Sequence, residues 1–307
     1  MTVNIWRSLI VDRIAITVVM KSKDLYDFAY SQLYGIAALE KDLVPKGKIT
    51  VVHEQYCTRL SYYPAYNKNE KRRIAVITVG ANILFGVGKL HRYFTLTLHP
   101  SQFKGQEFAD FKETLSVLLP EFNYEKLFYT GKVNYVEFAA DSHTHQKNSF
   151  LPYRKYCKES DVWPEPNGDL GTTYLGGKTS DLRFAIYDKS VQLIAKGKSP
   201  ITKHFPHTRI EARMRRLGIT AAELKTLKNP FSKLLIADLA AAQALSPEPD
   251  WQDFLTNAEH NGVPKELSAN PALRKQRMKS LGSVQVKWWS PVKTWGNQTQ
   301  ALAAIAP

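Results

Sequence analysis

Hydrophobic and polar residues alternate along several segments of the first two thirds of the chain, the pattern of strands with one buried face. The run 11–18, for example, places Ile14, Ile16 and Val18 on one side. The same alternation predicts strands at 73–79, 93–98, 133–141, 172–175, 182–189 and 207–216. Apolar residues at helical spacing predict helices over 24–39 and 106–119, the second ended by Pro120. This mixture indicates an α+β fold.

The pattern changes after Gly218. Residues 220–245 are rich in Ala and Leu, with an interruption near Asn229-Pro230, and helical spacing continues from 251 to 281. A strand pattern returns at 284–289, whereas 142–170 has the composition of a long loop. We therefore expect a curved, mainly antiparallel sheet with helices on one face in a domain of residues 1–218. A mainly helical region, 219–307, follows it.

The net charge of the chain indicates which class of partner it would bind. The 307 residues include 42 Lys and Arg against 28 Asp and Glu, a net charge of +14. An excess of this size favours an anionic partner, nucleic acid first and an acidic membrane surface second, although a basic protein without such a ligand remains an alternative. Two cysteines, Cys57 and Cys157, give no disulfide framework. Without a signal-peptide pattern or a run of about 20 apolar residues, we expect a cytoplasmic protein that does not associate with membranes.

The segment 172–189 carries the first candidate chemistry. On its second strand Arg183, Tyr187 and Lys189 share the polar face, and Lys178 lies in the preceding Gly-Gly-Lys turn. A phenol beside cations suits attack on a phosphodiester, because the phenol is the nucleophile and the cations bind the non-bridging oxygens. The alternative is an ordinary half-buried strand tyrosine.

Acidic residues on two other strands are candidate metal ligands. Glu211 shares a strand face with three arginines, Arg209, Arg213 and Arg215, either as a salt-bridge ladder or as a metal ligand within a phosphate-binding surface. Glu137 and Asp141 share another strand face, but four strand residues span about 13 Å, so one ion joins both only across a bulge. The pair His143 and His145 is an alternative metal site.

Together, these segments resemble the replication initiation factor family, the rolling-circle initiators of small plasmids and filamentous phages. The likeness runs over about residues 11–217, with the matching segments in the family's order. They are Tyr135-Val136-Glu137 with Asp141, then Tyr174-Leu175-Gly176 with Ile186-Tyr187-Asp188-Lys189, then Arg209-Ile210-Glu211-Ala212-Arg213. Glu137 stands where the family has Asp, and Tyr135 where it has Arg.

The resemblance implies a metal-dependent DNA nickase that starts rolling-circle replication at an origin. Tyr187, with Lys189 beside it, would attack the origin phosphate, become 5′-phosphotyrosyl-linked and free a 3′-hydroxyl. Mg²⁺ or Mn²⁺ would be held by Glu137, Glu211 and Asp141. Three alternatives stay open: an origin-binding protein that never cuts, a mobilisation relaxase or transposase of the same chemistry, and an RNA-binding protein.

The C-terminal region adds a second basic segment. Residues 265–293 hold seven Lys or Arg and one Glu, among them Arg274, Lys275 and Arg277, which we expect to contact duplex phosphates. Trp288, Trp289 and Trp295 either stack on single-stranded bases or are buried. The expected partner is origin DNA, duplex and single-stranded, with a host helicase and a second copy of the chain as further candidates.

Overall fold

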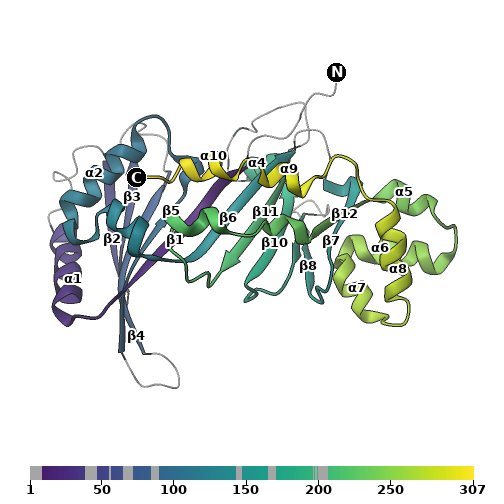
Figure 1. Ribbon diagram of the computed structural model, residues 1–307, viewed down its shortest axis with the longest axis horizontal. Helices are drawn as coiled ribbons and strands as arrows, with labels where there is room; N and C mark the ends of the chain where they lie inside the picture. The colour runs from purple at the N-terminus through teal and green to yellow at the C-terminus, as the bar shows by residue number, and fades with distance from the viewer. Residues whose placement is uncertain are drawn as a thin grey trace. The chain divides into compact units, whose positions relative to one another are not determined.

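The computed structural model describes residues 9–38, 47–54, 57–64, 72–83, 90–142, 147–164, 171–195, 197, 199 and 207–307 (Figure 1). The chain forms two compact units, each built from separate stretches of sequence. Unit 1 is Met1–Ile10, Phe138–Arg215 and Lys228–Ala301; unit 2 is Val11–Glu137, Arg216–Leu227 and Leu302–Pro307. Residues 228–301, which hold most of the C-terminal helices, belong to the same unit as Tyr187, and the domain boundary near residue 218 stays a prediction.

Unit 2 contains a sheet of antiparallel neighbours in the order β2-β3-β4-β5-β1. Ile14 and Ile16 of β1 are fully buried, as their alternation with polar residues requires. Helix α3 begins where the Asn123 side chain accepts a hydrogen bond from the backbone of Lys126. The elements are β1 (Ile10–Met20), α1 (Lys23–Ala38), β2 (Gly47–Glu54), β3 (Cys57–Pro64), β4 (Ala75–Ile83), β5 (Leu90–Leu98), α2 (Glu107–Leu118) and α3 (Tyr124–Thr130).

Strand β6 (Lys132–Ser142) runs through both units: its residues up to Glu137 belong to unit 2 and the rest to unit 1. In unit 1 the strand order continues β11-β10-β9-β8, and β7 pairs separately with β12. These strands are β7 (Phe150–Arg154), β8 (Ser160–Trp163), β9 (Thr172–Leu175), β10 (Leu182–Asp188), β11 (Thr208–Arg215) and β12 (Leu234–Asp238).

Around β7 and β12 of unit 1 lie α5, α6, α7 and α8, whereas α4 contacts β10 and β11 (Figure 1). Tyr153 of β7 packs with Trp251, Phe254 and Leu281 in an apolar cluster that holds the helices to the strand pair. Burial of apolar side chains in such a cluster is what stabilises short helices of this kind. The helices are α4 (Lys189–Ala195), α5 (Leu239–Ala244), α6 (Pro249–Asn261), α7 (Val263–Ala269), α8 (Arg274–Ser283), α9 (Pro291–Trp295) and α10 (Gln298–Ala303).

The predicted α+β class is confirmed, with antiparallel strands and with helices concentrated toward the C-terminus. Three local predictions are wrong. The predicted loop 142–170 contains β7 and β8, the predicted helical stretch 220–245 contains β12, and residues 284–289 form only an isolated bridge from Gln285 to Ala237. Short apolar runs suit a buried strand or a helix equally, and pairing partners decide between them. Among the described residues, no helix is long and apolar enough to cross a membrane.

Candidate active site around Tyr187

Three neighbouring strands of unit 1 bring the predicted site residues onto one sheet face. In the register of β10 and β11, Tyr187 lies opposite Arg209 and Arg183 lies opposite Arg213. Ala185 lies between these pairs, opposite Glu211 on β11 and Tyr174 on β9. Because side chains alternate along strands, the tyrosines, the arginines and Glu211 share a face.

The Tyr187 hydroxyl donates a hydrogen bond of 2.5 Å to Oε1 of Glu211. The other oxygen of the same carboxylate, Oε2, accepts from Arg213 through Nη2 at 2.7 Å and Nε at 3.1 Å. Tyr187 is 4% exposed and Glu211 is 3% exposed. A buried carboxylate therefore links a phenol to a guanidinium, so the phenolic proton already has an acceptor.

Asp141, predicted as a metal ligand, forms a buried ion pair. Its two oxygens accept from Nε and Nη2 of Arg209 at 2.6 and 2.8 Å, and Nε2 of the fully buried His207 lies 3.3 Å from Oδ1. Burial by itself would raise the pKa of Asp141, but the hydrogen bonds and charges of Arg209 and His207 hold it well below its usual range. The pair positions Arg209 directly opposite Tyr187 in the register.

Arg183 and Arg213 form a cross-strand pair of like charges. The Arg183 guanidinium carbon lies 3.9 Å from the ring centroid of the half-buried Tyr174, and that of Arg213 lies 5.6 Å from it. Arg183 also reaches Asp161 at 3.5 Å, and its own side chain is 10% exposed. Burial lowers the pKa of Arg183, and Arg213 and Arg215 are among the charges that lower it too. Two guanidinium groups opposed in this way are stabilised by an anion between them.

The two lysines of the predicted site do not lie on the strand that carries Tyr187. Lys189 is predicted at the end of the strand, but the strand ends at Asp188, whose side chain accepts from the backbone of Ser190 and Val191. Lys189 therefore begins α4, with Nζ bonded to Gln192 and 5.6 Å from the Tyr187 ring centroid. Lys178 is exposed, with Nζ 5.8 Å from the ring centroid of Trp163.

Each of the predicted metal ligands already has a partner within its own unit. Glu137 belongs to unit 2, where the Tyr135 hydroxyl donates to it at 2.7 Å. In unit 1 both oxygens of Asp141 are held by Arg209, and Glu211 is held by Tyr187 and Arg213. A divalent cation would have to displace guanidinium donors, so these contacts do not fit such an ion. Within the described ranges no group of three or more His, Cys, Asp or Glu is arranged to hold a metal. His143 and His145 lie outside those ranges.

The C-terminal basic residues lie on α8. Lys275 is exposed, Arg274 is half-buried, and the Arg277 guanidinium carbon stacks 4.5 Å from the ring centroid of Phe254. Of the three tryptophans of this region, Trp289 is 9% exposed and donates to the Leu234 carbonyl. Trp288 and Trp295 are half-buried, and Trp295 contacts Phe231. Burial, the alternative to base stacking, is therefore the observed state of Trp289.

Three residues that contact the site are not among the predicted site residues. Tyr174 is predicted only as part of a segment that carries the resemblance, His207 only as part of a strand, and Asp161 lies in the segment predicted as a loop. The alternation of β9 gives a usable signal for Tyr174, because it places this residue on the polar face. No protein-family model and no curated protein sequence matches the chain.

Proposed function

We propose that the protein is a DNA strand-nicking and strand-joining enzyme that starts rolling-circle replication at an origin, with Tyr187 as its nucleophile. The observation that carries the proposal is the hydrogen bond from the Tyr187 hydroxyl to Glu211, on a face that also holds Arg183, Arg209 and Arg213. A nucleophile, a proton acceptor and cations for a phosphate are the parts that phosphodiester transesterification needs.

In the proposed step, the Tyr187 oxygen attacks the phosphorus of the scissile phosphodiester. The phenolic proton passes to Glu211, a Tyr–O–P bond forms, and the P–O3′ bond breaks. The 3′-oxygen leaves with the bonding electrons and takes a proton from solvent, which frees a primer hydroxyl. Arg213 and Arg183 stabilise the negative charge that develops on the non-bridging oxygens. Attack by the 3′-hydroxyl on the phosphotyrosyl bond reverses these changes and rejoins the strand.

The resemblance also assigns Mg²⁺ or Mn²⁺ to Glu137, Asp141 and Glu211. The contacts of Asp141 and Glu211 do not fit that assignment, and the proposed step does not pass through a cation. Instead, Asp141 orients Arg209. The roles of Lys178, Lys189 and Arg215 are proposed as general attraction of the DNA strand, because Lys178 and Arg215 reach solvent and Lys189 lies on α4 rather than on the strand.

DNA is the proposed partner because the net charge of the chain and the arginines of the site both favour an anionic polymer of phosphates. A net charge of +14 favours a polyanion, and the paired guanidinium groups favour a phosphate at one point of the face. Arg274, Lys275 and Arg277 are proposed to bind duplex flanking the cleaved strand. Action on replicon DNA would place the protein in the cytoplasm, where a host helicase and a second copy of the chain are further proposed partners.

The experiment uses supercoiled replicon DNA with wild-type protein, Tyr187→Phe and Tyr174→Phe. We expect nicked circles with protein attached for the wild type and for Tyr174→Phe, and DNA binding without any adduct for Tyr187→Phe. Phe keeps the ring and removes only the hydroxyl, so a loss of folding is not expected to explain the result. Adduct formation by Tyr187→Phe would contradict the assignment.

A second candidate is an origin-binding protein that never cuts. It is favoured by the 4% exposure of Tyr187, because a phenol so enclosed also serves as an internal hydrogen bond that stabilises a basic binding surface. The same experiment distinguishes the two functions. Sequence-specific binding with no nick and no adduct from the wild-type protein would support the binding function and overturn the nickase.

A further inference from the structure

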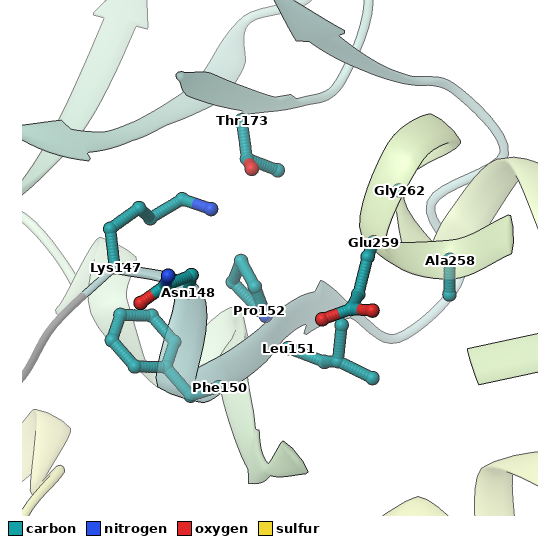
Figure 2. Close-up of a pocket in the computed structure, with 9 residues that line it drawn as sticks. All are labelled: Lys147, Asn148, Phe150, Leu151, Pro152, Thr173, Ala258, Glu259 and Gly262. Carbon is teal, nitrogen blue, oxygen red and sulfur yellow. The ribbon is translucent and has the colours of Figure 1, made fainter. Parts of the chain in front are cut away.

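Two hollows among the described residues of unit 1 adjoin the junction of α6 and α7, and they differ in size. The smaller, lined by Lys147, Thr173 and Glu259 (Figure 2), leaves about 10 Å³ for the centre of a water molecule, which is room for one water. The larger is a cleft beside β8 and leaves about 190 Å³ by the same measure. That is room for roughly a dozen waters, or for one flat aromatic base. Of the two, the cleft beside β8 is the one that can take a ligand group.

This cleft presents an exposed aromatic ring next to cationic side chains. Trp163, at the end of β8, is 56% exposed, although tryptophan is a residue type that is mostly buried. Nζ of Lys178 lies 5.8 Å from the centroid of its ring, and the exposed His260 and Lys265 line the cleft from α6 and α7. An exposed indole among cations suits an anionic ligand that carries flat aromatic groups of its own.

The strand register places Trp163 near the proposed nucleophile. Asp161 and Trp163 are two residues apart on β8, so they share a face. Asp161 lies opposite Tyr174 on β9. Tyr174 in turn lies opposite Ala185 on β10, two residues before Tyr187. Trp163 and Tyr187 therefore lie on the same face with β9 between their strands, two strand spacings or about 10 Å apart at the backbone. A strand with a phosphate at Tyr187 has a neighbouring base within reach of the Trp163 ring.

We propose that the cleft beside β8 binds one base of the single-stranded DNA that the protein cleaves, with Trp163 as the surface on which the base stacks. The inference rests on the proposed function, because it takes the cleaved strand as the ligand. Lys178 and Lys265 bind neighbouring phosphates. Asp161 is the acidic residue of the described lining, and Arg183, 3.5 Å from its carboxylate, offsets its charge. A single strand fits this cleft better than a duplex, whose bases are already stacked on one another.

The test measures binding without cleavage. A fluorescent oligothymidylate of about 12 nucleotides is titrated with the full chain and followed by fluorescence anisotropy. Trp163→Ala should weaken binding about 5- to 150-fold, the usual effect of removing a stacking ring, and Trp163→Phe should keep most of the affinity. Since Trp163 is exposed on the last strand of its sheet, its removal is not expected to unfold the protein. Tighter binding of an oligouridylate than of the oligothymidylate would overturn the assignment to DNA.

Tyr156→Ala is the matched control. Tyr156 is 81% exposed in the same unit, and Nζ of Lys155 lies 5.0 Å from the centroid of its ring, but neither residue lines the cleft. This variant should bind as the wild type does. Equal losses of affinity in Tyr156→Ala and Trp163→Ala would overturn a specific role for the cleft.

A salt series separates stacking from charge. Because stacking is not ionic, Trp163→Ala should lower the affinity at every salt concentration and leave the log–log salt slope unchanged. Lys265→Gln should flatten that slope by roughly 0.7 units, the effect of one lost phosphate contact on a single strand. Unchanged affinity in Trp163→Ala, or a flatter slope, would overturn the stacking role. An unchanged slope in Lys265→Gln would overturn the part assigned to Lys265.

Nicking at saturating protein separates this inference from the proposed function. Trp163 is assigned no contact with the reacting phosphate, so Trp163→Ala should nick at the wild-type rate once the strand is bound. A wild-type protein that nicks, with equal strand affinity in Trp163→Ala, would overturn the base-binding cleft and leave the nickase. A wild-type protein that never nicks, with weaker strand binding in Trp163→Ala, would overturn the nickase and support the cleft as a single-strand binding site.

Discussion

At the scale of single residues, Glu211 is proposed to take the proton of Tyr187. Glu211→Gln keeps an oxygen that can accept from the tyrosine but cannot take up its proton. We expect single-turnover nicking to slow by about 100- to 10,000-fold, the usual contribution of a general base, with DNA affinity little changed. Urea unfolding of the same variant controls for the weakened interaction with Arg213. Nicking at the wild-type rate would exclude Glu211 as the proton acceptor.

The buried pair of Asp141 and Arg209 predicts an effect on stability rather than on metal affinity. Asp141→Asn leaves a buried guanidinium without its counter-charge, which costs about 3–5 kcal/mol in the free energy of unfolding. Urea unfolding at neutral pH measures it. A loss of well under 1 kcal/mol would show that the pair is not formed in solution.

The same pair predicts a pH dependence. Since the pKa of Asp141 is depressed in the folded protein, its contribution is fully present above the ordinary value of 3.8 and is lost as pH falls through the folded pKa. The difference in unfolding free energy between wild type and Asp141→Asn should therefore be constant at neutral pH and shrink in acid. A difference that grows on acidification would contradict the assigned direction.

At the scale of strands and helices, opposed arginines on β10 and β11 should serve catalysis more than affinity. Arg213→Gln removes one of the two cations near the scissile phosphate, and we expect nicking at saturating protein to slow by about 10- to 100-fold. The binding constant should change much less, because many other phosphate contacts remain. Arg215→Gln on the same strand is the control, and an equal slowing in both variants would contradict a specific role for Arg213.

Alternation is enough to predict β9, β10 and β11, which carry most of the site. The predicted ends of β9 are the observed ones, and β10 ends one residue earlier than predicted because the Asp188 side chain starts a helix there. Alternation also places Tyr187, Arg183 and Glu211 on one face. It does not predict the hydrogen-bond partners of these side chains. The hydrogen bond from Tyr187 to Glu211 depends on the pairing of β10 with β11 and on the register of that pair.

The less predictable elements are those that depend on distant residues. β12 reads as part of a helix in the sequence, and it is a strand because β7 pairs with it from about 80 residues earlier in the chain. The prediction of Asp141 as a metal ligand has a similar origin. A carboxylate on a polar face can bind a metal ion or a guanidinium group. Only the position of Arg209, on β11, shows that the cation bound by Asp141 is a guanidinium group.

At the scale of the whole molecule, the net charge of +14 should appear as a steep salt dependence of DNA binding. Neutralising Arg274, Lys275 and Arg277 together should weaken binding and flatten the log–log salt slope by roughly one unit for each phosphate that the variant no longer neutralises. The nicking rate at saturating protein should stay the same. Binding constants across a salt series provide the measurement. Unchanged affinity and slope would show that α8 does not contact DNA.

The central claim is that Tyr187 becomes covalently joined to DNA, and peptide mapping tests it most directly. Protein incubated with origin DNA is digested with nuclease and protease, and the peptides that retain a nucleotide are sequenced by mass spectrometry. The account predicts a nucleotide linked through phosphate to Tyr187 and none on Tyr174. A nucleotide on any other residue, or none at all while circles are nicked, would contradict it.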